Sequence, residues 1–130
     1  MPYYLDTSAF VKLVVREPES KALLAWAKRV KAEFFASELL RAEALRAARR
    51  HSPTVLQEAR ARLDVVTLVS VTSDICERAA ELDPEILRTL DAIHLATALS
   101  ATDALDGVVS YDERLAAACQ LHGVAVLAPQ

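Results

Sequence analysis

Four acidic residues stand where a strand ends, where a helix begins or on an otherwise apolar helix face, and could do chemistry together: Asp6, Glu43, Asp91 and Asp112. Asp6 directly follows a short apolar run, residues 3–5, that is typical of a buried strand. Asp112 follows a second such run, residues 107–110. Because open parallel sheets bind their ligands at the carboxyl ends of the strands, both aspartates are expected in a crevice at one sheet edge.

The other two acids are expected on helices, on faces that are otherwise apolar. Asp91 lies in the segment 90–101, which carries no other formal charge. Its structural alternative is a helix start capped by Thr89, with Asp91 favouring the helix dipole. Glu43 falls inside the apolar arc of its helix, in mid-helix, where capping cannot account for it. An unpaired buried carboxylate is costly, so Glu43 needs a cation, hydrogen bonds or a proton. An ion pair with Arg46 or Arg50 is the structural alternative.

Asp112 has a structural alternative of its own. Ser110 and Glu113 have the S-x-x-E spacing of a capping box, so acids at this helix start could serve the helix alone. They would stabilise the helix dipole by roughly 0.3–1 kcal/mol without any chemistry.

Four carboxylates in one crevice would repel one another. Two unit charges about 4 Å apart cost on the order of 4 kcal/mol at an effective dielectric near 20, so a multivalent cation is expected among them. Oxygen ligands without cysteine or clustered histidine favour Mg²⁺ or Mn²⁺. Such an ion activates a water for in-line attack on a phosphodiester. Thr7 and Ser8 could then bind a carboxylate, a metal-bound water or the scissile phosphate, helix N-capping being the equal alternative.

Short apolar strands and amphipathic helices alternate along the chain and would position these residues. Strands are predicted at 3–5, 33–37, 65–71, 107–110 and 124–128, and helices at 9–15, 19–30, 38–51, 54–63, 73–82, 89–101 and 112–122. Ser37 is the predicted N-cap of the helix 38–51. Nearly all-apolar strands that alternate with helices indicate a three-layer α/β/α domain with a central, mainly parallel sheet of four or five short strands.

Composition predicts one compact domain over residues 1–130, with 53% hydrophobic residues and a net charge of −3. The two halves differ in sign: residues 12–62 carry twelve Lys or Arg against six Asp or Glu, and residues 63–130 carry three against eleven. Two explanations of this asymmetry are equally good: solvated helix faces, or a basic and an acidic surface with separate partners. The chain has no membrane-spanning pattern and no basic leader, so a cytoplasmic location is expected.

The cysteines and histidines show no metal-ligand spacing. Cys76 and Cys119 are expected to be small buried apolar side chains, with one disulfide between them as the alternative. Three histidines are expected to be structural: His51, His94 and His122.

Four segments resemble a known family: "YYLDTSAFVKL", "SELLRAEALRAARR", "LRTLDAIHLATAL" and "VVSYDERLAAAC". In this order they are similar to the four acidic motifs of PIN-domain ribonucleases, specifically the VapC toxins of bacterial type II toxin–antitoxin systems. The resemblance implies a PIN fold, Mg²⁺- or Mn²⁺-dependent endonucleolytic cleavage of RNA, and a homodimer neutralised by a cognate VapB antitoxin. It also implies that the four acids are catalytic, with Asp6, Asp91 and Asp112 on the metal and Glu43 bound directly or through water.

Arginines crowd the helix that bears Glu43 and are predicted RNA contacts: Arg41, Arg46, Arg49 and Arg50. Two other functions stay open. Asp6 could be the nucleophile of an aspartyl-phosphate phosphotransferase, although Ser8 stands where that class has a second acid. A PIN-like module could also bind RNA without cleaving it.

Overall fold

The structure, a computed structural model of the chain, describes residues 2–130. Its strands are β1 (Pro2–Leu5), β2 (Glu33–Ser37), β3 (Thr67–Val69), β4 (Gly107–Val109) and β5 (Val126–Leu127). Its helices are α1 (Thr7–Val14), α2 (Ser20–Val30), α3 (Leu39–Arg49), α4 (Pro53–Leu63), α5 (Ser73–Glu81), α6 (Thr89–Leu99) and α7 (Glu113–Leu121), and a short 3-10 helix spans Thr102–Ala104.

The five strands form one sheet in the order β3-β2-β1-β4-β5, and every pairing in it is parallel. This confirms the predicted parallel sheet and its number of strands. β1 is central and pairs with β2 on one side and with β4 on the other. The chain therefore turns in opposite directions from β1 and from β4, and their carboxyl ends open the crevice at which such sheets bind ligands.

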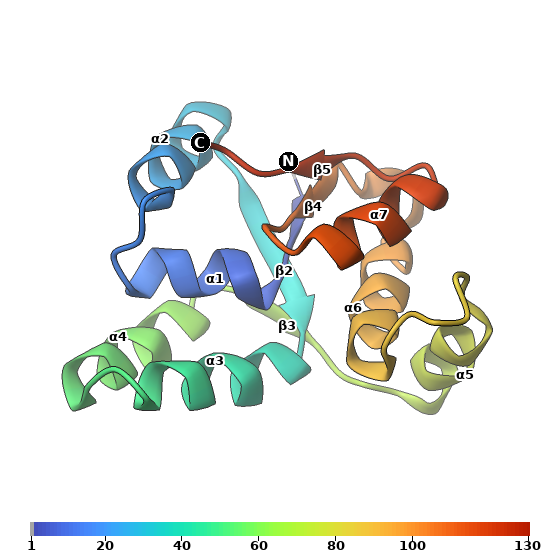
Figure 1. Cartoon of the computed structure of the whole chain (residues 1–130), viewed down its shortest axis with the longest axis horizontal. Helices are drawn as coiled ribbons and strands as arrows, with labels where there is room; N and C mark the ends of the chain where they lie inside the picture. The colour runs from blue at the N-terminus through green and yellow to red at the C-terminus, as the bar shows by residue number, and fades with distance from the viewer. Residues whose placement is uncertain (1) are drawn as a thin grey trace.

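Helices cover both faces of this sheet. Figure 1 shows α1, α3 and α4 together on one side of the strands, whereas α5, α6 and α7 lie on the other. The core between these layers includes Tyr4, Phe10 and Leu95, each at most 1% exposed. Burying a side chain of this size contributes roughly 1.5–3 kcal/mol, so the layers fix the strand ends firmly.

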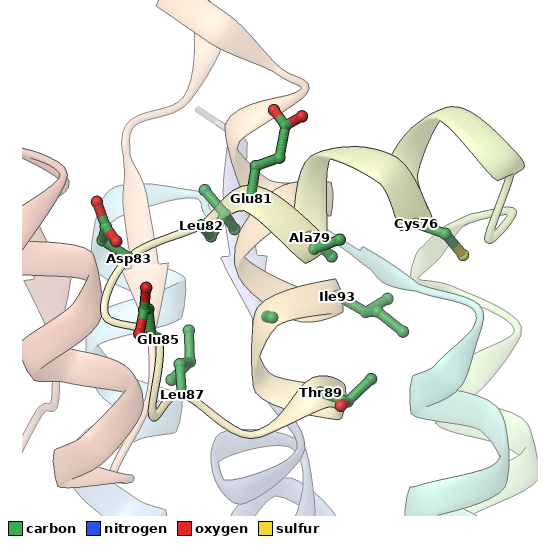
Figure 2. A pocket seen from close by; sticks show the side chains of 11 residues that line it. Cys76, Ala79, Glu81, Leu82, Asp83, Glu85, Leu87, Thr89 and Ile93 are labelled. Atoms are coloured by element: carbon green, nitrogen blue, oxygen red, sulfur yellow. The ribbon is translucent and has the colours of Figure 1, made fainter.

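α5 and α6 enclose a smaller apolar cluster of Ile75, Ala79, Ala92 and Ala96. A hollow of about 730 Å³ lies beside it, and Figure 2 shows the carboxylates of Glu81, Asp83 and Glu85 around this hollow.

Within residues 2–130, every helix is too short or too polar to span a bilayer.

Several local predictions were wrong in detail. Ser37 is the last residue of β2, and Glu38 is the N-cap of α3, although the Ser37 hydroxyl does accept a hydrogen bond from the N–H of Leu39. Cys76 is exposed and only Cys119 is buried, so both thiols are free. An exposed thiol facing solvent from α5 cannot meet one that is sealed in the core beneath α7.

Candidate active site

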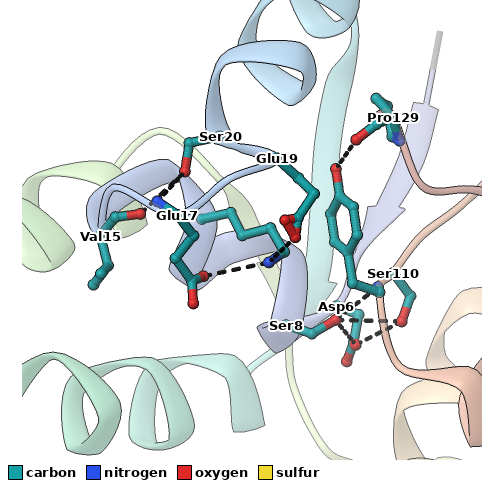
Figure 3. A network of polar contacts seen from close by, with 10 residues as sticks. Asp6, Ser8, Val15, Glu17, Glu19, Ser20, Ser110 and Pro129 are labelled. Atoms are coloured by element: carbon teal, nitrogen blue, oxygen red, sulfur yellow. Dashed lines mark hydrogen bonds and ion pairs between the residues drawn. The ribbon is translucent and has the colours of Figure 1, made fainter.

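Asp6 lies between β1 and α1 and is only 5% exposed. One of its carboxylate oxygens, Oδ2, accepts hydrogen bonds from the hydroxyls of Ser8 and Ser110, both at 2.8 Å. Figure 3 shows these two serines on either side of Asp6. The backbone N–H of Asp6 donates to the carbonyl of Val109, which ties the end of β1 to the end of β4. Asp6 is thus held by one oxygen, while Oδ1 has no partner among the described residues.

Glu43, on α3, is held in a similar way through its Oε1. The Thr7 hydroxyl donates to Oε1 at 2.8 Å, and His94 Nε2 lies 2.6 Å from the same oxygen. Because an ionised carboxylate only accepts, Nε2 carries the proton of this hydrogen bond. The predicted structural alternative, an ion pair with Arg46 or Arg50, is wrong, because the imidazole of α6 occupies that place.

His94 is itself fixed from behind by the Tyr4 hydroxyl, which is hydrogen-bonded to Nδ1. The same hydroxyl accepts the backbone N–H of Ser37 at 3.0 Å. Tyr4 and His94 are fully buried, so a continuous hydrogen-bonded chain runs from β2 through the core to the carboxylate of Glu43. Burial raises the pKa of Tyr4, which therefore stays a neutral phenol.

The pKa values of Glu43 and His94 move in opposite directions. Burial alone would raise the pKa of Glu43, but the hydrogen bond and charge of His94, with the Thr7 hydroxyl, lower it below its usual range. Burial alone would lower the pKa of His94, but the hydrogen bond to Glu43 and the charges of Asp6, Glu43 and Asp91 raise it. Both shifts favour an ion pair.

Asp112 is the N-cap of α7, and its Oδ1 accepts the backbone N–H groups of Arg114 and Leu115. The structural role considered for Asp112 is therefore real. The predicted capping box is wrong, however, because Ser110 lies before the cap. Its hydroxyl donates to Asp6 and accepts the N–H of Asp112 at 3.1 Å, so one serine links two of the acids.

Asp91 lies in the first turn of α6 and makes no hydrogen bond or ion pair within residues 2–130. Desolvation raises its pKa, and repulsion from Asp112, Asp6 and Glu43 raises it further. Asp91 is thus close enough to each of the other three acids to be repelled by it. We call Asp6, Glu43, Asp91 and Asp112 the four-acid site.

The four-acid site is not a closed metal cage: across residues 2–130, no three His, Cys, Asp or Glu side chains are grouped tightly enough to hold an ion as they stand. Its donor chemistry nevertheless fits a hard divalent cation. Its four acids supply carboxylate oxygens, Asp91 is repelled by the other three acids, and Asp6 keeps one oxygen without a partner among the described residues. A cation would relieve this repulsion.

The arginines predicted to contact RNA lie on the exposed face of α3. Arg41 pairs with Glu38 at 2.9 Å, whereas Arg46, Arg49 and Arg50 have no ion pair among the described residues. None of them reaches Glu43.

Sequence reasoning missed three residues that hold the acids: Tyr4, His94 and Ser110. His94 had one usable signal, since it lies three residues after Asp91 in a helix that is otherwise apolar. The sequence indicated for Tyr4 only a place in a strand, and for Ser110 only a place in a capping box.

The chain matches the family model of the PIN domain over residues 3–121. It is 42% identical over 126 residues to Ribonuclease VapC46 of Mycobacterium tuberculosis (strain ATCC 25618 / H37Rv), a match that covers 97% of this chain and 96% of the relative. It is 36% identical over 130 residues to Ribonuclease VapC47 of Mycobacterium tuberculosis (strain CDC 1551 / Oshkosh), with the same coverage.

Solved structures share the fold at lower sequence identity. A toxin–antitoxin complex from Klebsiella pneumoniae matches with a TM-score of 0.72 at 23% identity, over 98% of both chains. The VapBC2 complex from Rickettsia felis, bound to a promoter DNA fragment, matches with a TM-score of 0.72 at 13% identity over the whole of both chains.

Proposed function

Because the chain belongs to the PIN-domain family, and within it to the VapC ribonucleases, we propose that it hydrolyses RNA phosphodiester bonds at the four-acid site with Mg²⁺ or Mn²⁺. It is a VapC-type endoribonuclease, the toxin class of VapBC toxin–antitoxin systems. In this proposal residues 1–130 form one PIN domain. The observation that carries the location of the site is the electrostatic coupling of Asp91 to the other three acids.

In the proposed site, Asp6, Asp91 and Asp112 would hold the cation and Glu43 would bind it directly or through water. Mg²⁺ or Mn²⁺ bound there supplies a Lewis acid for the phosphate and lowers the pKa of a water. The residues of the chain orient this chemistry. Ser8 and Ser110 fix one oxygen of Asp6, which leaves Oδ1 as the oxygen that would meet the cation.

Glu43 has a comparable division between its two oxygens. Thr7 and His94 occupy Oε1, so only Oε2 is available to accept a hydrogen bond from a water or to meet the cation. Thr7 and Ser8 thereby act in the proposal as hydroxyls that support carboxylates, the first of the roles considered for them.

Further parts of the proposal concern partners. We propose that exposed arginines of α3 hold RNA phosphates, with Arg46, Arg49 and Arg50 contributing more than Arg41, which is already paired. We also propose that the protein acts in the cytoplasm as a homodimer and that a cognate VapB-type antitoxin inhibits it. The named structural neighbours that are toxin–antitoxin complexes support the antitoxin.

The test is cleavage of RNA by the purified protein and by Asp6→Asn. We expect cleavage with Mg²⁺ or Mn²⁺, none in excess EDTA, and at least a hundredfold loss in Asp6→Asn, because removal of a charge-stabilising group costs on the order of 10²–10³ in rate. Asp74→Asn is the matched control, since this aspartate is exposed on α5 and away from the site. Thermal unfolding of each variant would exclude loss of the fold.

Undiminished cleavage by Asp6→Asn, or by wild type in chelator, would overturn the proposed site. The same assay separates the two other functions. A phosphotransferase would acquire phosphate on Asp6 from a phosphate donor and leave RNA intact, and a non-cleaving module would bind RNA without producing new ends.

A further inference from the structure

A hollow of about 500 Å³ opens directly beside the four-acid site, and no role has been assigned to it above. Asp91 forms part of its wall. The rest comes from the α5–α6 connection, residues 84–88, and from one face of α7 that includes Arg114 and Leu121. This volume lies within the range of about 300–1,000 Å³ that small-molecule sites occupy.

Two large apolar side chains of this hollow are open to water. Ile86 is 91% exposed and Leu121 is 63% exposed, although the domain buries most of its other aliphatic side chains. Both line the hollow, one from the α5–α6 connection and one from the end of α7. Paired exposed apolar side chains at a concave site indicate a ligand with an apolar face.

Two arginines complete the hollow. Residues 63–130 contain only three cations against eleven acids, and one of the three, Arg78, pairs with Asp74 at 3.3 Å. The other two, Arg88 and Arg114, both line this hollow, and neither makes an ion pair within residues 2–130. The unpaired positive charge of the acidic half is therefore concentrated where the hollow meets Asp91.

The walls are held in place without a ligand. His122 Nε2–H donates to the carbonyl of Asp83 at 2.9 Å and so ties the α5–α6 connection to the end of α7. Within that connection the N–H of Leu87 donates to the carbonyl of Pro84 at 2.9 Å, and the Leu87 side chain packs against the core. The hollow is thus a formed part of the fold.

We propose that this hollow is a subsite for a nucleotide next to the scissile phosphate of the RNA substrate. The base lies against Ile86 and Leu121, and Arg88 and Arg114 contact the phosphates on either side of it. Single-stranded nucleic acid is bound by basic groups that hold its phosphates beside apolar side chains that cover its bases; here the apolar side chains are aliphatic and not the more usual aromatic ones. The inference rests on the proposed function of the four-acid site, since Asp91 sets its position relative to the cleaved bond.

The larger hollow between α5 and α6 does not offer this chemistry. Its rim carries the carboxylates of Glu81, Asp83 and Glu85, as Figure 2 shows, and these would repel a phosphate. The smaller hollow is therefore the one that complements an RNA chain.

The first test uses the methyl signals of the three isoleucines, Ile75, Ile86 and Ile93. The Asp6→Asn variant, labelled at isoleucine δ1 methyl groups, is titrated by NMR with mixed-sequence single-stranded RNA in EDTA, so that the RNA stays intact. Because an aromatic base shifts a nearby methyl resonance, we expect the Ile86 signal to move with RNA concentration. Ile75 is buried between α5 and α6 and should move much less.

The second test is steady-state cleavage of RNA by Leu121→Asp, Arg114→Gln and Arg88→Gln. Each should raise KM about fivefold or more and leave kcat within about twofold, because loss of a stacked base or a phosphate contact weakens binding and not the chemical step. Val65→Asp and Arg29→Gln are matched controls, since both residues are exposed and lie elsewhere, after α4 and on α2. We expect both controls to keep the wild-type KM.

The outcomes separate this inference from the proposed function. If wild-type protein cleaves RNA but the Ile86 methyl signal stays still and the three variants keep their KM, the subsite is wrong and the four-acid mechanism stands. If wild type cleaves no RNA with either metal, the proposed function itself fails. If Leu121→Asp instead abolishes self-association in sedimentation while KM is unchanged, the hollow is an interface with a second copy, and the subsite is overturned.

Discussion

Three carboxylates of the four-acid site, those of Asp6, Glu43 and Asp112, are positioned by hydrogen bonds, and Glu43 illustrates how. Its Oε1 is shared by Thr7 and His94, and His94 is in turn held by Tyr4. Hydrogen-bonded partners of this kind orient a ligand and are sensitive to mutation. In the proposed mechanism His94 is a positioning residue, because its contact with the site is through Glu43.

We therefore predict that His94→Leu lowers RNA cleavage about 10- to 100-fold, because it removes the donor to Glu43 and leaves the Tyr4 hydroxyl without its partner. His94→Gln retains an N–H donor and should recover part of the loss. The measurements are kcat and the Mg²⁺ concentration at half-maximal rate, which a purely structural defect would not shift. His51→Gln, at an exposed position after α3, is the control. Equal activity of His94→Leu and wild type would contradict the positioning role.

The Glu43–His94 pair also predicts how stability depends on pH. The pKa of Glu43 is lowered from 4.5, so its contribution is present above that pH and is lost as pH falls through the lower folded value. The pKa of His94 is raised from 6.5, so its contribution is present below 6.5 and is lost as pH rises through the higher folded value. The pair stabilises the fold most between about pH 4.5 and 6.5.

The measurement is the free energy of urea unfolding of wild type and Glu43→Gln, both in EDTA, across this pH range. The difference between the two proteins should be largest between pH 4.5 and 6.5 and should shrink on either side. A difference that stays constant from pH 5 to 9 would show that the pair is not ionised in the folded protein.

At the scale of elements, α7 begins at a residue that is also a member of the four-acid site. Asp112 caps the helix through Oδ1, so removal of its side chain should affect stability and cleavage together. The two roles can be separated, because a serine caps a helix but does not supply a carboxylate.

We predict that Asp112→Ala loses about 0.5–2 kcal/mol of unfolding free energy, whereas Asp112→Ser stays within a few tenths of a kcal/mol of wild type. Both variants should lose RNA cleavage, if Asp112 binds the cation. Urea unfolding and cleavage assays on the same preparations check this. A fully active Asp112→Ser would leave Asp112 with a capping role alone.

The elements also show what the sequence could predict. The strand at 3–5 and the helix at 89–101 are confirmed nearly to the residue, since their apolar patterns are continuous and their ends are marked. The strands at 65–71 and 124–128 are shorter than predicted, and the structure has Thr67–Val69 and Val126–Leu127. Both are edge strands with one neighbour, so pairing ends where that neighbour ends, and no local pattern encodes this length.

The candidate site, too, could be predicted from the sequence only in part. The four acids could be selected from sequence because each is an anomaly in its own element. The contacts that hold them could not: His94 meets Glu43 across 51 residues, and Ser110 meets Asp6 across 104. Such pairings depend on how α6 packs against β2 and on the order of β1 and β4. The local S-x-x-E pattern misassigned Ser110, because a hydroxyl that can cap a helix can equally bind a carboxylate.

At the scale of the whole molecule, the basic and acidic halves of the sequence lie on different sides of the sheet. Three exposed arginines of α3 stand without ion pairs on one side of the sheet, and α5 with its acidic hollow lies on the other (Figure 1). A long RNA is therefore expected to approach over α3, with Arg88 and Arg114 as the cations of residues 63–130 that have no ion pair among the described residues.

This arrangement predicts the salt dependence of RNA binding. In Asp6→Asn protein, Arg46→Gln and Arg49→Gln should each reduce the slope of log K against log salt by about 0.7, the value for one lost phosphate contact on a single strand. Arg41→Gln should change the slope less, since Arg41 is already paired with Glu38. Fluorescence anisotropy with labelled single-stranded RNA at several salt concentrations measures each slope. If all three variants keep the slope of the Asp6→Asn parent, the RNA does not bind over α3.

The dispersal of the four acids along the chain has a consequence for synthesis. Asp6 is translated first, yet its partner Ser110 and the neighbouring strand β4 leave the ribosome only after the other helices and strands except α7 and β5. A nascent chain therefore cannot assemble the site, however long translation pauses before that point. In the proposed function, a nascent chain therefore cannot cleave RNA on the ribosome that is making it before Ser110 and β4 have emerged.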